Sequence, residues 1–253
     1  MAVVSLRGVG KTFGSGTLAL DGLDLDVGAG EFLSLLGPSG CGKSTALRIV
    51  AGLSEPSRGT VNWPDPAARA GIGFVFQEPT LMPWATVFAN VNLPLKLAGV
   101  ARAAAAPRVE DTLRRVGLSE FRDAYPRELS GGMKMRVSIA RALVTQPRLL
   151  LMDEPFAALD EITRFKLNDD LLALWRELGM IVVFVTHSVF ESVYLSQRVV
   201  VMTARPGRVS SELVVDAAVR DAQFRTSAEY AGHCRQASEA LATAMDARTG
   251  AAA

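Results

Sequence analysis

The fold is decided by residues 32–45, which read FLSLLGPSGCGKST. The apolar run Phe32 to Leu36 predicts a buried strand, and a helical stretch from Lys43 to Ala51 follows the glycines. Between these elements, residues 37–44 fit the pattern G-x-x-x-x-G-K-[ST] of a phosphate-binding loop, which requires a strand before it and a helix after it. The alternative is a glycine-rich turn that fits the pattern by accident, and the matching strand and helix argue against it.

The chemistry of this loop explains its residue types. Glycines allow successive backbone N–H groups to turn toward phosphate oxygens, and the helix N-terminus adds positive potential. Lys43 supplies a point charge, and the Ser44 hydroxyl offers a ligand to Mg²⁺. We therefore expect a nucleoside triphosphate to be bound by Gly37, Pro38, Ser39, Gly40, Cys41, Gly42, Lys43, Ser44 and Thr45.

Strand and helix patterns alternate along the rest of the chain, which indicates an α/β fold. Several strands are apolar throughout, as is typical of a largely parallel sheet that is covered on both faces. From about Glu78 to Thr145 only helical periodicity persists, which predicts a helical subdomain inserted into the sheet domain. The further strands are predicted at Val3 to Leu6, Gly71 to Phe76, Leu149 to Met152, Ile181 to Thr186 and Val199 to Met202, and the further helices at Val109 to Val116, Met133 to Val144 and Glu161 to Leu178. Two segments, Ala101 to Ala106 and Asp216 to Ala253, are merely rich in alanine.

Composition excludes several classes of protein. With 253 residues, 49% hydrophobic and 21% charged, the chain is long enough and apolar enough for a large core. A net charge of +1 provides no overall field for a nucleic acid or an acidic membrane. We expect a soluble, unsecreted protein, because the N-terminus lacks a signal pattern and apolar runs such as Ile181 to Val185 are too short to cross a bilayer. Cys41 and Cys234 fit a reducing cytosol.

A second motif suggests what happens to the nucleotide. The apolar strand Leu149 to Met152 is followed by two carboxylates, Asp153 and Glu154. At the carboxyl edge of the sheet, Asp153 can hold Mg²⁺ and Glu154 can accept a proton from an attacking water. Acidic residues at this position can also simply cap the next helix, and the phosphate-binding loop elsewhere in the chain favours the catalytic interpretation.

Four further features complete a recognisable set. Gln77 ends a predicted strand, Leu129 to Met133 precedes a helix, Ala158 to Asp160 follows the two carboxylates, and His187 ends the strand Ile181 to Thr186. In this order, and over about residues 3–215, the set resembles the ATP-binding subunit of an ABC transporter. The run Leu81 to Val87 looks like the importer branch for nitrate, sulfonates and taurine.

The resemblance implies roles for named residues. Lys43, Gln77, Glu154 and His187 would be catalytic, and Ser44, Gln77 and Asp153 would hold Mg²⁺. Phe13 would stack on adenine, while Ser130, Gly131 and Gly132 of one chain would cover the ATP bound by a second copy. Each residue also has a structural alternative: Ser130 as a helix cap, Gln77 as a strand cap, Phe13 as a core residue and His187 as a hydrogen-bonding group. The family usually has Gln where this chain has Met133, so a side-chain hydrogen bond is lost there while we expect ATPase function to survive.

The fold and partners follow from the same resemblance. It implies a P-loop NTPase domain at 1–215, with an N-terminal antiparallel β region and a helical subdomain at about 78–145, and an Ala-rich helical tail at 216–253. It also implies ATP and Mg²⁺ as cofactors, a homodimer, two transmembrane permease subunits, and a periplasmic or lipid-anchored solute-binding protein. The chain would lie peripherally on the cytoplasmic face of the bacterial inner membrane and bind no nucleic acid.

The sequence leaves alternatives for the transported solute and for the class of ATPase. The solute could be nitrate, a sulfonate, a taurine-like compound or a pyrimidine precursor of thiamine. A non-transport ABC ATPase and a P-loop kinase are the rivals. The near-zero net charge argues against the first. A kinase would leave without a role both His187 and Leu129 to Met133, which would be the signature motif of the ABC family. The cluster Pro79, Leu81, Met82, Pro83, Trp84 and Phe88 is either subdomain core or a groove for a helix of a membrane partner.

Overall fold

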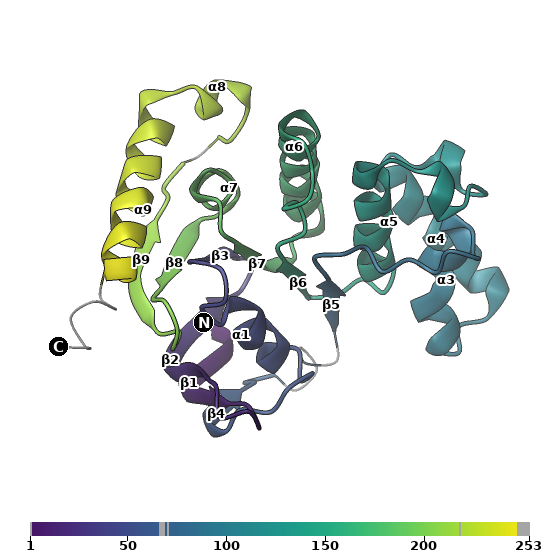
Figure 1. Cartoon of the computed structure of the whole chain (residues 1–253). Helices are drawn as coiled ribbons and strands as arrows, with labels where there is room; N and C mark the ends of the chain where they lie inside the picture. Colours follow the sequence, from purple (N-terminus) through teal and green to yellow (C-terminus); the bar gives the residue numbers. More distant parts are fainter. Residues whose placement is uncertain (1, 66–68, 70, 218, 247–253) are drawn as a thin grey trace. The chain divides into compact units, whose positions relative to one another are not determined.

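The computed structural model describes residues 2–65, 69, 71–217 and 219–246 (Figure 1). The chain forms two compact units, one made of residues 1–70 and 181–253 and the other of residues 71–180. We refer to them as unit 1 and unit 2. Within the described residues, none of the helices has the length and apolar character needed to cross a bilayer.

Unit 1 contains four strands in the order β7 (Ile181–Thr186), β3 (Phe32–Leu36), β8 (Arg198–Met202) and β9 (Val209–Val214). The first three are parallel, and β9 is antiparallel to β8. Every residue of β3 and β7 is buried, which is why both strands are largely apolar, with Ser34 and Thr186 as the polar exceptions. The predicted strands at 32–36 and 181–186 are confirmed, and β8 begins one residue earlier than predicted.

Helices of unit 1 pack against these strands. Helix α1 (Lys43–Val50) contacts β7, and α7 (Val189–Leu195) contacts β3. In the segment predicted as an Ala-rich helical tail, a short helix α8 (Ala222–Arg225) leads into α9 (Ala228–Asp246), which packs on α7, β8 and β9 (Figure 1). The ring of Tyr230 in α9 is T-shaped against that of Tyr194 in α7, which fixes the tail to this helix.

Unit 1 also contains an antiparallel sheet in the order β2 (Leu18–Gly28), β1 (Ala2–Thr12) and β4 (Arg58–Asn62). Leu6 lies opposite Leu25 in β2 and opposite Val61 in β4. The sheet confirms the antiparallel β region, but the predicted strand at 3–6 was too short, and β2 and β4 were not predicted from the residues.

Unit 2 pairs two short strands, β5 (Ile72–Val75) and β6 (Leu149–Asp153), in parallel. The described chain between them, residues 76–148, is free of strands and forms α3 (Val87–Leu97), α4 (Arg102–Arg115), two 3₁₀ turns (Ser119–Phe121 and Pro126–Glu128) and α5 (Gly131–Leu143). Helix α6 (Glu161–Leu178) follows β6 and has the predicted bounds. The helical region is therefore present where the periodicity indicated it.

Helix α4 corrects one expectation. The sequence predicted a helix from Val109, after Pro107, and treated Ala101 to Ala106 as a biased segment. In the structure the helix begins at Arg102 and includes both the alanines and Pro107. Alanine has the highest helix propensity, and the buried residues Ala105, Val109 and Leu113 continue one packed face of the helix across the proline.

Candidate functional site

The phosphate-binding loop lies between β3 and α1 in unit 1. Gly40 and Gly42 have φ values of 74° and 106°, in the left-handed region that favours glycine. A Cβ on Gly42 would lie 2.7 Å from Leu20 Cδ2 and 2.8 Å from the Ala19 carbonyl oxygen. The loop conformation therefore depends on glycine both for its backbone angles and for its contact with β2.

Lys43 is buried inside the loop, with 3% of its surface exposed. Its Nζ donates to the carbonyl oxygens of Gly37 and Pro38 at 2.7 and 2.9 Å, and the Cys41 N–H donates to Pro38 at 3.3 Å. A buried ammonium group needs such acceptors. The lysine and the Cys41 amide thus share the interior of the loop, where a phosphate group would take the place of these carbonyls.

His187 follows β7 directly and is exposed. Leu36 pairs with Thr186 across the parallel strands β3 and β7, so Gly37 and His187 leave the sheet at the same edge. The Thr186 hydroxyl donates to Glu191 Oε2 at 2.5 Å and accepts from the Ser188 N–H at 3.0 Å. These buried bonds on either side of His187 fix the backbone that carries it.

Phe13 lies at the tip of the β1–β2 hairpin, where its N–H donates to the Thr17 carbonyl at 3.0 Å. The side chain is 42% exposed, and the Lys11 ammonium lies 5.5 Å from the ring centroid. The structural alternative, burial in the core, is therefore wrong. The exposed ring is available for stacking.

In unit 2, the pairing of β5 with β6 places Gln77, Asp153 and Glu154 at one edge of the two strands. Val75 pairs with Met152, so the chain reaches Gln77 two residues beyond one strand and Asp153 at the end of the other. Asp153 is 6% exposed, and Glu154 has a φ of 46°. A left-handed backbone at a residue other than glycine is uncommon and is found preferentially at functional sites.

The signature residues begin α5. Ser130 is its N-cap, and the hydroxyl accepts from the Met133 N–H at 3.2 Å. A Cβ on Gly132 would lie 2.6 Å from Thr163 Cγ2 in α6, so this glycine allows the two helices to approach. The structural role of Ser130 is confirmed. It does not oppose a phosphate contact, because the hydroxyl still has a proton to donate.

Residues 158–160 lead into α6. The Asp160 side chain accepts from the Thr163 N–H at 3.0 Å as the N-cap of this helix. That backbone hydrogen bond lowers the pKa of Asp160, so the residue is held in its charged form.

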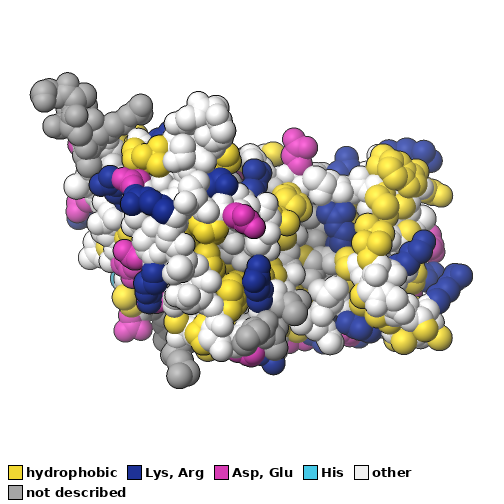
Figure 2. Space-filling view, turned by 90° about the horizontal axis from the view of Figure 1, so that it is seen from below, with side chains coloured by type: hydrophobic (Ala, Val, Ile, Leu, Met, Phe, Trp, Pro, Cys, Tyr) yellow, Lys and Arg dark blue, Asp and Glu magenta, His cyan; other side chains and the backbone are white. Residues whose placement is uncertain are grey.

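Of the cluster around Trp84, Pro83 and Trp84 form an exposed loop, whereas Leu81 and Met82 are half-buried and Phe88 lies in α3. Trp84 is 77% exposed, which rules out the core interpretation for this residue. The fully buried side chain of Asn90 holds the loop: its amide donates to the carbonyls of Met82, Ala85 and Thr86 at 3.0–3.2 Å, and its Oδ1 accepts from the Met82 N–H at 2.8 Å. Figure 2 shows hydrophobic side chains, together with Lys and Arg, gathered at the right end of the view, over the helices α3, α4 and α5.

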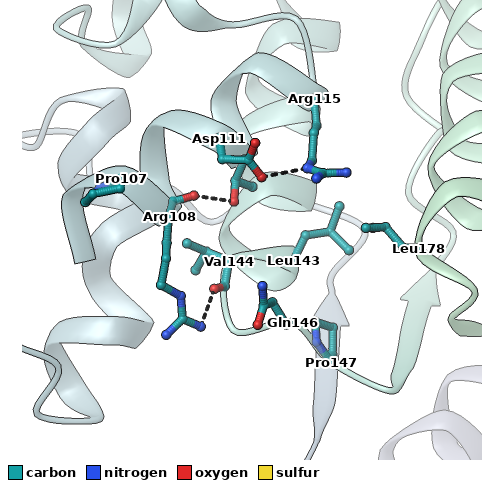
Figure 3. Close-up of a pocket in the computed structure, with 10 residues that line it drawn as sticks. Pro107, Arg108, Asp111, Arg115, Leu143, Val144, Gln146, Pro147 and Leu178 are labelled. Atoms are coloured by element: carbon teal, nitrogen blue, oxygen red, sulfur yellow. Dashed lines mark hydrogen bonds and ion pairs between the residues drawn. The ribbon is translucent and has the colours of Figure 1, made fainter. Parts of the chain in front are cut away.

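A cavity of about 440 Å³ lies elsewhere in unit 2, at the carboxyl ends of α5 and α6, and contains none of the predicted site residues. Figure 3 shows the Arg108 guanidinium reaching the Val144 carbonyl, a contact of 3.0 Å, and Arg115 beside Asp111. Arginines that satisfy the last carbonyls of a helix stabilise its C-terminus. We interpret this cavity as a structural feature.

The predicted residues are divided between the units. Phe13, the loop 37–45 and His187 belong to unit 1, and Gln77, Ser130 to Gly132, Asp153 and Glu154 belong to unit 2. The sequence reasoning missed Asn90, Glu191 and an arginine, Arg205, whose Nε and Nη2 donate to the Gly40 carbonyl at 3.2 Å. An asparagine at an apolar helical position was the available signal for Asn90. Arg205 stood next to a Pro-Gly pair that indicated only a turn.

Comparisons with known proteins identify the family of this chain. A family profile described as ABC transporter matches residues 20–157. Over 214 residues, the chain is 47% identical to an aliphatic sulfonates import ATP-binding protein, SsuB 1 of Pseudomonas savastanoi pv. phaseolicola, covering 85% of this chain and 86% of that protein. An uncharacterized ABC transporter ATP-binding protein of Methanocaldococcus jannaschii is 46% identical over 233 residues, 91% of this chain and 86% of its own length.

The solved structures that are similar to this chain include an ATP-binding cassette and a part of an ABC transporter complex. The cassette MJ0796, described as dimeric and bound to ADP and Pi in a post-hydrolysis state, is 34% identical with a TM-score of 0.73 and covers 85% of this chain and 99% of its own. The protein cbiO1 of Clostridium perfringens, part of the ABC transporter complex cbiONQ, is 26% identical with a TM-score of 0.77 and covers 93% and 99% of the two chains.

Proposed function

This chain belongs to the ABC transporter family and is an ABC-type ATPase, and from that premise we propose that it is the ATP-hydrolysing subunit of a bacterial importer for a small solute, with an aliphatic sulfonate as the first candidate. The observation that carries the proposal is the 43–47% identity to several aliphatic sulfonates import ATP-binding proteins over 84–85% of the chain. Nitrate, taurine-like compounds and a pyrimidine precursor of thiamine are the alternative cargoes.

The proposed reaction uses residues of both units. Lys43 and the loop amides bind the β- and γ-phosphates, and Phe13 stacks on the adenine. Glu154 accepts a proton from the attacking water, while Gln77 and His187 orient the reacting groups. Ser130, Gly131 and Gly132 close over the nucleotide of a second copy, so that hydrolysis requires a homodimer.

The residues proposed for Mg²⁺ have suitable donor atoms. Ser44, Gln77 and Asp153 offer a hydroxyl, an amide and a carboxylate oxygen, and Mg²⁺ prefers oxygen ligands. When bound, Mg²⁺ neutralises negative charge on the phosphate oxygens.

We further propose how the subunit is organised and where it works. Residues 1–215 form the ATP-binding domain, with the helical subdomain at about 78–145, and residues 216–253 form a helical tail. The exposed loop around Trp84 contacts one of two transmembrane permease subunits at the cytoplasmic face of the membrane, and a solute-binding protein delivers the cargo through them. No nucleic acid takes part, in keeping with the net charge of +1.

The substitution Glu154→Gln tests the chemistry. It keeps the shape of the side chain and removes the proton acceptor, so we expect ATP binding to persist while turnover falls about 10²- to 10⁴-fold. Glu161→Gln, a few residues along the chain at the exposed start of α6, is the matched control and should retain activity. Near-normal turnover of Glu154→Gln would remove this residue from the mechanism.

The cargo is tested in cells that lack the chromosomal copy of the gene. We expect the intact gene, but not the Glu154→Gln variant, to restore growth on an alkanesulfonate as sole sulfur source. Uptake of labelled nitrate, taurine or the thiamine pyrimidine, with no defect in sulfonate uptake, would reassign the cargo and leave the importer role in place. If none of these uptake activities depends on the gene, the importer proposal is wrong.

A further inference from the structure

The outer side of the phosphate-binding loop is held by the turn between β8 and β9, residues 203–208. Arg205 donates from Nε and Nη2 to the carbonyl oxygen of Gly40, both at 3.2 Å. Beside it, Gly207 is buried, and a Cβ at this position would lie 2.1 Å from the Cys41 carbonyl oxygen. The turn therefore contacts two consecutive carbonyls of the loop.

The turn itself is well fixed. The Thr203 hydroxyl donates to the Pro206 carbonyl at 3.0 Å and accepts from the Arg208 N–H at 3.0 Å. The Gly207 N–H donates to the Ala19 carbonyl at 2.9 Å, and the Gly207 carbonyl accepts from the Asp21 N–H at 3.1 Å. These bonds anchor the turn to β2, the strand that also contacts Gly42, so Arg205 extends from a rigid base.

The side of the loop that faces Arg205 borders a hollow. Pro38, Ser39 and Gly40 border a hollow of about 360 Å³, which Ala204, Arg205 and Met245 also line. Within the described part of the chain, no carboxylate is found within 4.0 Å of the Arg205 guanidinium, so its donors on this side go to one carbonyl.

Because the Gly40–Cys41 peptide is planar and trans, the bond from Arg205 to the Gly40 carbonyl also affects the direction of the Cys41 N–H. The carbonyl of Gly40 and the N–H of Cys41 belong to one peptide plane and point in opposite directions. With the carbonyl held outward by Arg205, the Cys41 N–H faces inward, where it now donates to the Pro38 carbonyl at 3.3 Å and where Lys43 Nζ also bonds. Both groups lie where the proposed function puts the phosphates.

We propose that Arg205 is a positioning residue for ATP binding, which keeps the Gly40–Cys41 peptide in the orientation that presents the Cys41 N–H to phosphate. The inference rests on the proposed nucleotide site. Loss of Arg205 removes none of the groups proposed to bind phosphate, but it allows this peptide, and with it the Cys41 N–H, to rotate. The apparent affinity then falls in proportion to the fraction of molecules that keep the competent orientation.

The test compares three substitutions in the full chain. For Arg205→Ala we expect the Kd for ATP and for ADP to rise about 2- to 10-fold, which corresponds to the net contribution of one exposed hydrogen bond. The KM for ATP should rise in parallel, and kcat should stay within about 2-fold. Arg208→Ala is the control: this arginine lies in the same turn and is also exposed, and it pairs with Asp21 instead of the loop. Arg205→Lys keeps one charged donor and should recover part of the affinity.

Alkylation of the thiols gives a second readout that needs no nucleotide. Cys41 is 1% exposed and follows the peptide in question, whereas Cys234 is 7% exposed in α9. We expect Arg205→Ala to speed alkylation of Cys41 several-fold and to leave Cys234 unchanged.

Two results would overturn the inference: nucleotide affinity and Cys41 reactivity both equal to those of Arg208→Ala, or equal acceleration at Cys41 and Cys234, which would indicate general destabilisation. If the unmodified chain bound no ATP, the proposed function would fail, and the alkylation rates would still decide whether Arg205 holds the loop.

Discussion

Asn90 offers a sharp test of how the exposed loop around Trp84 is maintained. Its side chain is completely buried, yet it serves the loop and not the core: it makes hydrogen bonds with the backbone of Met82, Ala85 and Thr86. The substitution Asn90→Ala removes these partners without introducing a clash. The Met82 N–H and the loop carbonyls must then find water or remain unpaired.

The hydrogen bonds of Asn90 determine how much stability the substitution should remove. A typical intramolecular hydrogen bond contributes about 0.5–1.5 kcal/mol net, and an unpaired buried group costs about 1–3 kcal/mol. The loop backbone is partly buried, so water can reach some of the released groups. We therefore expect Asn90→Ala to lower the free energy of unfolding by about 2–4 kcal/mol, and to lower Tm by about 2–4 °C for each kcal/mol in a chain of this size.

The measurement is urea unfolding followed by circular dichroism, with a thermal melt of the same samples. Asn92→Ala is the matched control, because Asn92 lies on the same helix and its buried Oδ1 has no hydrogen-bond partner among the residues that the structure describes. We expect this control to remain within about 0.5 kcal/mol of the parent chain. If the two variants unfold at the same urea concentration with equal slopes, the loop does not depend on Asn90 and the reasoning is refuted.

The remaining predictions concern Trp84 and Gly132. Because Trp84 is 77% exposed, Trp84→Ala should leave the melting curve nearly unchanged. In a pull-down it should lower the affinity for the membrane subunits by about thirtyfold, which is the effect of losing about 2 kcal/mol at an interface anchor. A large fall in Tm would contradict this prediction. Gly132→Ala should lower the free energy of unfolding by about 1–3 kcal/mol, because its Cβ would lie 2.6 Å from the methyl of Thr163. The control Gly232→Ala in α9, with nothing within 4 Å of its Cβ, should raise the free energy of unfolding by about 0.5–1 kcal/mol. Stabilisation by both substitutions in denaturant unfolding would show that α5 and α6 do not meet closely at Gly132.

The parts of the fold that could be predicted from sequence are those whose residues are buried uniformly. Strands β3 and β7 are buried at every position, so mostly apolar segments indicate where they lie. Strand β4 contains no fully buried residue and therefore has no hydrophobic pattern to detect. Strand β2 does alternate between buried and exposed positions, and its leucines and aspartates were a signal that went unused.

In the candidate site, the residues that could be identified from sequence are those whose role depends on their neighbours along the chain. Gly42, Lys43 and Ser130 could be assigned because a phosphate-binding loop and a helix N-cap are encoded within a few consecutive residues. The contacts of Asn90 and Arg205 depend on which segments the folded chain places side by side. Arg205 is 165 residues from Gly40 in the sequence, and no pattern in either segment refers to the other.

The bonds from Lys43 to the carbonyls of Gly37 and Pro38 bear on anion selectivity. Binding at this loop is an exchange reaction, in which an incoming anion displaces acceptors that the ammonium group already has. Chloride or another simple anion offers only its charge in return and leaves the surrounding amides without oxygen acceptors. A chain of phosphates supplies several oxygens at once, to the ammonium and to the N–H groups around it. In the proposed ATP site, the existing bonds of Lys43 would therefore favour the binding of a nucleotide over that of a small anion.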